Sequence, residues 1–138
     1  MSHLCTIATQ LKSLPAIQAA CLALGWTLSA GGVVRYYAGD GPPVDYHIDL
    51  NDPALARYNI GLRRTADGFE VLLDNAMRLP HSLPAGQLGG ETPRILNSLR
   101  REYAKAVILA VAKRQGRRVH QTVEADGRIR LRLSGGRH

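Results

Sequence analysis

Three side chains on one short segment have the types and spacing of a metal or acid–base site. Residues 44–50 alternate between apolar and polar, so Asp45, His47 and Asp49 share one face of a predicted strand. Such residues ligate metals, and a neighbouring carboxylate can orient a histidine and raise its pKa so that it acts as a base. No further ligand-type residue completes the set, and the solvent face of a half-buried strand has the same pattern. We therefore expect no metal, and these three residues are the candidates if one binds.

The two cysteines do not have the spacing of a metal-binding or redox pair. Cys5 and Cys21 lie far apart, in a predicted strand and a predicted helix, without a Cys-x-x-Cys motif. We expect small buried hydrophobic side chains rather than a disulfide. The sequence shows no nucleophile paired with a base, so we expect no catalytic residues, no cofactor and no enzymatic activity.

Positive charge is the strongest signal in the composition. The chain has 18 Lys and Arg residues against 11 Asp and Glu residues, which gives a formal net charge of +7. Such a balance favours anionic partners, among them nucleic acid, acidic protein surfaces and anionic membranes. The alternative interpretation is that the excess charge keeps a small domain soluble.

An arginine stripe near the end of the chain is the candidate anion site. Residues 128–133 alternate so that Arg128, Arg130 and Arg132 share one face. Guanidinium groups match phosphate oxygens, although this face lacks aromatic side chains on which bases could stack. A charged solvent face has the same pattern. The full candidate set for anion or nucleic-acid binding is Arg101, Lys105, Arg117, Arg118, Arg128, Arg130 and Arg132.

These arginines belong to a predicted closing hairpin. Its apolar residues fall opposite Val119 and Val123 only if the loop has three residues, with Gly127 as the left-handed residue of a bulged turn. That register aligns Glu124 with Arg128, Thr122 with Arg130 and His120 with Arg132.

A long helix precedes this hairpin. Thr92 suits the capping position, Pro93 suits the first helical position, and no breaker follows until Gly116. Ile108 lies on the charged side of the helix with Leu109 beside it, so the pair is the candidate contact with a protein partner or a second copy of the chain. The opposite, apolar face contains Ile95, Leu96, Leu99, Tyr103, Ala106, Val107 and Ala110.

The first half of the chain predicts one helix and several strands. Ser13 can cap a short amphipathic helix, and Gly25 can end it. Strands are expected over residues 3–10, 26–29, 33–37 and 44–50, with a tight turn at residues 30–32 and a loop at 39–43, where two prolines and two glycines occur.

A second hairpin is predicted over residues 58–74. A two-residue or a four-residue loop places its apolar sets on the same side, and the four-residue register sets Arg63 opposite Glu70. Residues 76–90 contain two prolines and three glycines, and we expect a flexible loop there.

These elements predict a single α+β domain over residues 1–138. We expect an antiparallel sheet of about six to seven strands with two helices on one face, in the order β-α-β-β-β-β-β-α-β-β. The first residues lack the features of a secretory signal, and no apolar run approaches the roughly 20 residues that span a bilayer. We therefore expect a cytoplasmic protein without a membrane partner.

Several segments resemble a known family. They include the opening residues 1–9, residues 58–64, residues 67–71 with Asp74, Tyr103 with Ala104, Gly116, and residues 124–131. Together they resemble the hypothetical chloroplast reading frame thirty-five family, also called DUF1257, and the match covers nearly the whole chain in order. The resemblance implies no catalytic residues. It does imply an accessory role, because genes of the family often occur beside genes for AAA-type ATPases.

Two hypotheses follow. The first is a non-enzymatic adaptor or regulatory subunit that acts through protein contacts and has an AAA-type ATPase as a candidate partner. The alternative is a basic nucleic-acid-binding module that uses the arginine face of the closing hairpin. Homodimer formation through Ile108 and Leu109 is a further expectation of the first hypothesis.

Overall fold

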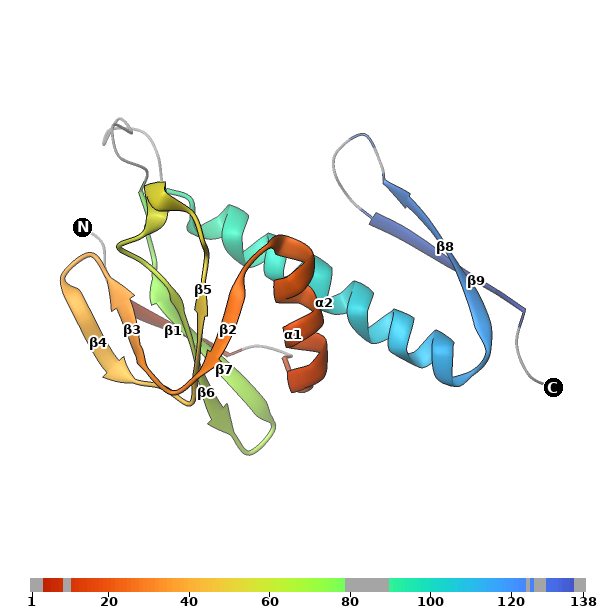
Figure 1. The fold of residues 1–138 in the computed structure, drawn as a ribbon, viewed down its shortest axis with the longest axis horizontal. Helices are drawn as coiled ribbons and strands as arrows, with labels where there is room; N and C mark the ends of the chain where they lie inside the picture. The colour runs from red at the N-terminus through yellow and green to blue at the C-terminus, as the bar shows by residue number, and fades with distance from the viewer. Residues whose placement is uncertain (1–3, 9–10, 79–89, 124, 126–128, 136–138) are drawn as a thin grey trace.

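The computed structural model describes residues 4–8, 11–78, 90–123, 125 and 129–135 (Figure 1). In these residues the chain has the predicted α+β fold, with helices α1 (Leu14–Leu24) and α2 (Thr92–Arg114) packed on one face of an antiparallel sheet. The strands of this sheet follow the order β1 (Leu4–Ala8), β7 (Gly68–Asp74), β6 (Ile60–Thr65), β5 (Tyr46–Asp49) and β2 (Thr27–Ala30). Two hairpins complete the described fold, namely β3 (Val33–Tyr36) with β4 (Gly39–Pro43), and β8 (Arg117–Val123) with β9 (Ile129–Gly135).

Helix α1 begins and ends where the sequence predicts. Ser13 has extended backbone angles, and its hydroxyl accepts a hydrogen bond from the Ala16 backbone N–H at 3.3 Å. Gly25 takes the left-handed conformation at φ 75° and its N–H returns to the last turn of the helix. The helix buries Ile17 and Cys21 against the sheet.

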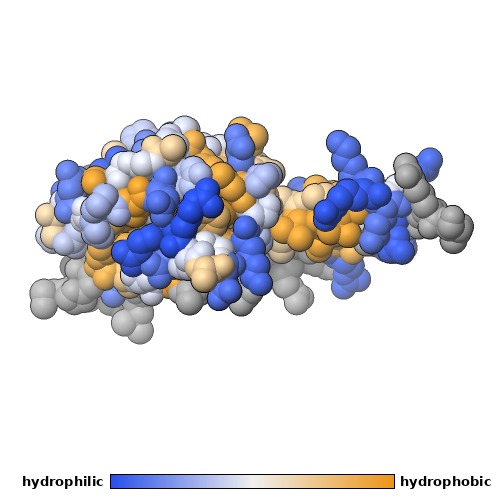
Figure 2. All heavy atoms as spheres, turned by 90° about the horizontal axis from the view of Figure 1, so that it is seen from below, coloured by the Kyte–Doolittle hydropathy of each residue, from blue (hydrophilic) through white to orange (hydrophobic). Residues whose placement is uncertain are grey.

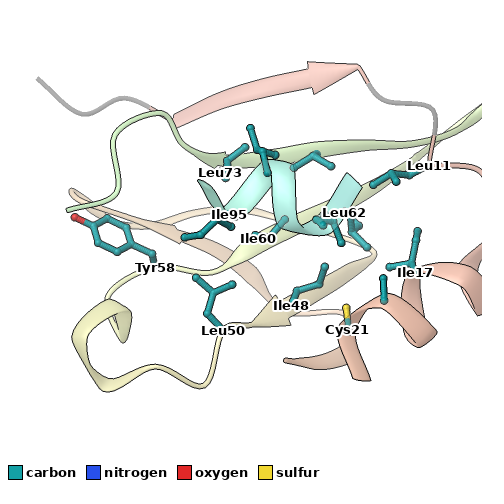
Figure 3. Packing of buried hydrophobic residues seen from close by; sticks show 14 of the residues in the cluster. Leu11, Ile17, Cys21, Ile48, Leu50, Tyr58, Ile60, Leu62, Leu73 and Ile95 are labelled. Carbon is teal, nitrogen blue, oxygen red and sulfur yellow. The ribbon is translucent and has the colours of Figure 1, made fainter. Parts of the chain in front are cut away.

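The main core lies between the sheet and the two helices. Figure 3 shows Ile48, Ile60 and Leu62 of the sheet gathered with Ile17 of α1 and Ile95 of α2. All five side chains are at most 1% exposed. Replacing one of them with alanine is expected to cost about 2–5 kcal/mol.

A smaller cluster covers the other face of the sheet. Val34 of β3 packs with Val44 and Leu72, and Leu4 lies against them. The strand alternation predicted over residues 44–50 would place Val44 on the same face as Ile48, and this was wrong, because Val44 precedes β5 and alternation holds only within one continuous strand.

The predicted pairing of the strands around Gly31 and Gly32 was also wrong. The first strand, β2, pairs with β5, whereas β3 pairs with β4. Both glycines have positive φ, at 72° and 85°, but their backbone groups pair with Asp45 and Val44, before β5, and so do not close a hairpin between β2 and β3. The predicted loop at residues 39–43 is strand β4, and a two-stranded edge tolerates its prolines because little of its ladder needs their missing N–H groups.

The second hairpin forms as predicted from strands β6 and β7. Arg63 pairs with Glu70 across the strands and forms a salt bridge with it at the surface. Arg64 lies on the same side as the apolar set, where its guanidinium stacks 5.2 Å from the ring of Phe69 and 5.5 Å from the ring of Tyr46.

Helix α2 ends as predicted but is not capped as predicted. Pro93 lies in the first turn, and Gly116 has φ 69° directly beyond the helix. The N-cap is Glu91, not Thr92. The Thr92 hydroxyl instead donates to the Asp74 carbonyl and accepts from the Met77 N–H, both at 2.8 Å, so it fixes the start of α2 to the end of β7.

The segment between β7 and α2 is described only at its ends. Ala76 and Met77 are buried there, so the expected loop over 76–90 starts inside the core. Residues 79–89, on which the predicted flexibility falls, lie outside the described residues.

Both cysteines are free thiols, and Cys21 is buried as expected. Burial raises the pKa of Cys21 to about 11, and burial together with the charge of Asp74 raises the pKa of Cys5. In the described part of the chain, neither helix has the length and apolar character needed to cross a membrane.

Candidate functional site

The end of α2 and the β8–β9 hairpin form an arm that projects from the body of the fold (Figure 1). We define the arm as residues 104–135. Tyr103 is its anchor, because the Tyr103 hydroxyl accepts hydrogen bonds from the backbone N–H groups of Lys12 and Ser13 at 2.9 and 3.0 Å. Beyond Tyr103 the helix continues to Arg114 and carries the hairpin about 16 Å further out.

The hairpin has the predicted register. Thr122 pairs with Arg130 and His120 with Arg132, while Glu124 and Arg128 lie outside the described residues. Directly opposed residues share a face of an antiparallel pair, and Arg118 opposes Ser134 two residues further along the same face. Arg118, Arg130 and Arg132 therefore share one exposed face.

The structure does not bring all seven candidate basic residues together. Arg117 opposes Gly135 and lies on the other face of the hairpin, because adjacent strand residues alternate. Arg101 lies 13 residues before Arg114, about 20 Å along α2, and Lys105 lies 4.0 Å from Glu102 in an ion pair on the helix. Among the described candidates, the shared face thus consists of Arg118, Arg130 and Arg132, and Arg128 lies outside the described residues.

Charge is distributed unevenly between the arm and the body. From residue 103 onward the sequence holds nine of the 18 basic residues but two of the 11 acidic residues. The formal net charge of +7 therefore resides in this C-terminal segment, and residues 1–102 are balanced. Figure 2 shows hydrophilic side chains bordering the arm.

The same arm exposes apolar side chains. Ile108 and Leu109 are each 38% exposed, as the sequence predicts, and Figure 2 shows a hydrophobic patch on the arm beside the hydrophilic side chains. Sequence reasoning missed two more exposed side chains on the body, Leu22 at 74% and Tyr37 at 60%. Helical spacing places Leu22 on the side of α1 away from the buried residues Ile17 and Cys21, so the pattern could have indicated its exposure.

The three residues of the candidate metal row, Asp45, His47 and Asp49, each form a hydrogen bond with a backbone group. The Asp45 carboxylate accepts from the Arg64 N–H at 2.7 Å, and the Asp49 carboxylate accepts from the Asn51 N–H at 3.0 Å. His47 Nδ1 donates to the Gly31 carbonyl at 2.8 Å. Among the described residues, no group of three or more His, Cys, Asp or Glu is arranged to hold a metal ion.

A pocket of about 330 Å³ lies beside the first turn of α2, and sequence reasoning did not find it. Its polar side chains already have partners. The Asn51 amide donates to the Gly25 carbonyl at 2.8 Å, Asp52 accepts from the Ala54 N–H at 2.9 Å, and Arg94 pairs with Glu91 at 3.0 Å. The rest of the lining consists of Leu24, Trp26, Leu50, Pro53, Leu55 and Ile95.

Comparison with known proteins gives a family but no characterised relative. Neither the curated proteins nor the solved structures contain a significant match to this chain. A family model described as a protein of unknown function, DUF1257, matches residues 21–132. This match begins in the last turn of α1 and covers all of α2, all of β2 to β8 and the first residues of β9. The chain therefore belongs to the DUF1257 family of proteins of unknown function.

Proposed function

We propose that the protein is a non-enzymatic adaptor or regulatory subunit that binds an acidic surface of a protein partner through its arm. The observation that carries this proposal is that the exposed pair Ile108 and Leu109 lies on the segment that also holds the formal net charge of +7. An apolar patch with a basic border favours a partner with the complementary arrangement.

The architecture of the arm supports a role in binding a partner protein. A two-stranded hairpin is marginally stable alone in water, and both outer edges of β8 and β9 lack a neighbouring strand among the described residues. Packing on α2 supports the hairpin from one side. A partner that covers the arm would stabilise it further and bury the apolar pair.

An AAA-type ATPase is the partner that we would test first, because the family resemblance suggests it. The roles of Asp45, His47 and Asp49 in backbone hydrogen bonding support a function through contacts rather than through chemistry at that row.

A nucleic-acid-binding module is the second candidate. It is favoured by the shared face of Arg118, Arg130 and Arg132, since a row of guanidinium groups can follow a phosphate backbone. The two candidates differ in the macromolecule retained and in salt dependence. Phosphate contacts give a log–log salt slope of about one per contact, whereas the adaptor contact combines charge on the arm with the apolar pair Ile108 and Leu109, so its salt slope should be shallower.

The test is affinity capture of the tagged protein from its host, with and without nuclease, at low and moderate salt. We expect one defined protein to be captured even after nuclease treatment and to bind the purified wild-type chain directly. The Ile108→Asp variant should no longer capture it. Leu22→Asp is the matched control, because Leu22 is more exposed but lies outside the arm. Capture that depends on nucleic acid and on Arg130→Glu, but not on Ile108→Asp, would favour the second candidate.

A further inference from the structure

Two arginine side chains bury a guanidinium nitrogen that has no hydrogen-bond acceptor among the described residues. One is Nε of Arg35 on β3, and the other is Nη1 of Arg78 beyond β7. A guanidinium cannot lose its proton in a folded protein, so such a donor remains charged and unfavourable without an acceptor. A bound ion or water is the usual explanation.

Two consecutive residues hold the backbones of these arginines. Asn59 is fully buried, and its Oδ1 accepts from the Arg35 N–H at 2.6 Å while its own N–H donates to the Arg35 carbonyl at 3.3 Å. The neighbouring Tyr58 hydroxyl accepts from the Arg78 N–H at 3.4 Å. Figure 3 shows the Tyr58 hydroxyl directed away from the centre of the core.

A third arginine lies beside them. Arg57 directly precedes Tyr58, and its guanidinium carbon lies 5.3 Å from the ring centroid of Tyr37, just after β3. The backbones of Arg35 and Arg78 and the Arg57 side chain therefore lie around the one segment formed by Arg57, Tyr58 and Asn59.

A buried carboxylate connects the same segments without neutralising these arginines directly. Asp74 accepts from the N–H groups of Tyr37 and Ala76, both at 2.8 Å, and is fully buried. In the described part of the chain, Asp74 forms no ion pair with Arg35, Arg57 or Arg78. The site thus has donors in excess of acceptors.

We propose that Arg35, Arg57 and Arg78 bind an oxyanion, either the phosphate or the carboxylate group of a small ligand. Guanidinium donors match the paired oxygens of both groups, and charge-assisted hydrogen bonds to them are the strong kind. The anion supplies the acceptors that the buried Arg35 and Arg78 nitrogens lack, and Arg57 closes over it from solvent. This site is separate from the arm and does not depend on the proposed adaptor function.

The test measures thermal unfolding of the full chain against inorganic phosphate, with ionic strength held constant by chloride. We expect the unfolding midpoint to rise and saturate with phosphate and not with chloride. Arg35→Met and Arg78→Met should each weaken the apparent affinity about tenfold or more. Because Arg57 is exposed, Arg57→Met tests the same site without disturbing a buried group, and should also weaken binding. Malonate in place of phosphate distinguishes a carboxylate ligand from a phosphate ligand.

Two controls separate this site from other basic residues. Arg94→Met removes a surface arginine that already pairs with Glu91, and the variant should respond to phosphate as the wild type does. Arg130→Gln with Arg132→Gln should also keep the response, which would show that the arm is not the site. An equal response in wild type and in all three site variants, or an equal effect of chloride, would overturn the proposal.

Discussion

At the scale of single residues, buried polar side chains join segments that strand pairing leaves unconnected. Asn59 holds β3 through both its backbone and its amide, which donates from Nδ2 to the Val33 carbonyl at 3.0 Å. Tyr103 links the middle of α2 to the residues before α1 through its hydroxyl. Each contact satisfies a group that would otherwise be unpaired, and removing one partner costs about 1–3 kcal/mol.

The Cys21 thiol predicts a stability loss at high pH. Its pKa rises from 9.0 in the unfolded chain to about 11 in the folded protein because the thiol is buried. The folded state thus holds the thiol proton more tightly than the unfolded chain. The stability that depends on the protonated thiol is fully present below pH 9 and is lost as the pH rises toward 11. We expect the loss to reach about 3 kcal/mol of the free energy of unfolding above pH 11.

The measurement compares urea unfolding of the wild type with that of Cys21→Ala at neutral pH and at a pH between the two pKa values. The variant is less stable at neutral pH because it loses buried volume, and the difference should narrow at the higher pH. A difference that stays constant would contradict the buried, protonated thiol.

At the scale of elements, the Gly31–Gly32 turn separates β2 from β3. Gly31 donates its N–H to the Asp45 carbonyl at 2.7 Å, and the Gly32 carbonyl accepts from the Val44 N–H at 3.1 Å. These bonds place β3 over the far face of the sheet, where Val34 packs with Leu72.

Alanine substitutions at these two glycines should differ in cost. A Cβ at Gly32 would lie 2.5 Å from His47 Nδ1, whereas a Cβ at Gly31 would have no atom within 4 Å. Both have positive φ, so Gly31→Ala should cost about 1 kcal/mol and Gly32→Ala about 3 kcal/mol. Chemical denaturation of both variants measures the two free energies of unfolding. Equal decreases would show that the His47 side chain moves aside from the new Cβ at no cost.

At the scale of the whole molecule, charge and shape divide the chain at Tyr103. The body has a balanced sequence and a core on each face of its sheet, whereas the arm carries the excess positive charge and an exposed apolar pair. Clustered charge produces a stronger local potential than the same charge spread over the surface.

This division predicts unequal effects of equal charge changes. Replacing Arg118, Arg130 and Arg132 with glutamine should lower the salt concentration at which the protein leaves a cation exchanger more than the same change at Arg63, Arg94 and Arg100. Arg63 and Arg94 belong to the body and already pair with Glu70 and Glu91. If both triple variants eluted at the same salt concentration, the arm would not be the main determinant of binding to the exchanger.

Local sequence determined the elements whose ends and registers depend on near neighbours. The α1 boundaries follow from Ser13 and Gly25, and the β8–β9 register follows from alternation combined with a short loop. The Arg63–Glu70 pair follows from the same logic. For the two hairpins a one-residue shift would exchange the two faces of a strand, so alternation determines the register.

Contacts between distant residues were decided by the tertiary structure. Nothing near Thr92 in the sequence indicates that its hydroxyl binds Asp74 and Met77, and nothing near Arg35 indicates that Asn59 holds it. The pairing of β2 with β5, the separation of Arg117 from the arginine face, and the contact of Arg57 with Tyr37 have the same origin. The sequence by itself determined the α+β class, the ends of α1 and the registers of the β6–β7 and β8–β9 hairpins, because these depend on local spacing. Which segments meet was decided only in three dimensions, because burial and hydrogen bonding between remote residues select one packing among those that the local patterns allow.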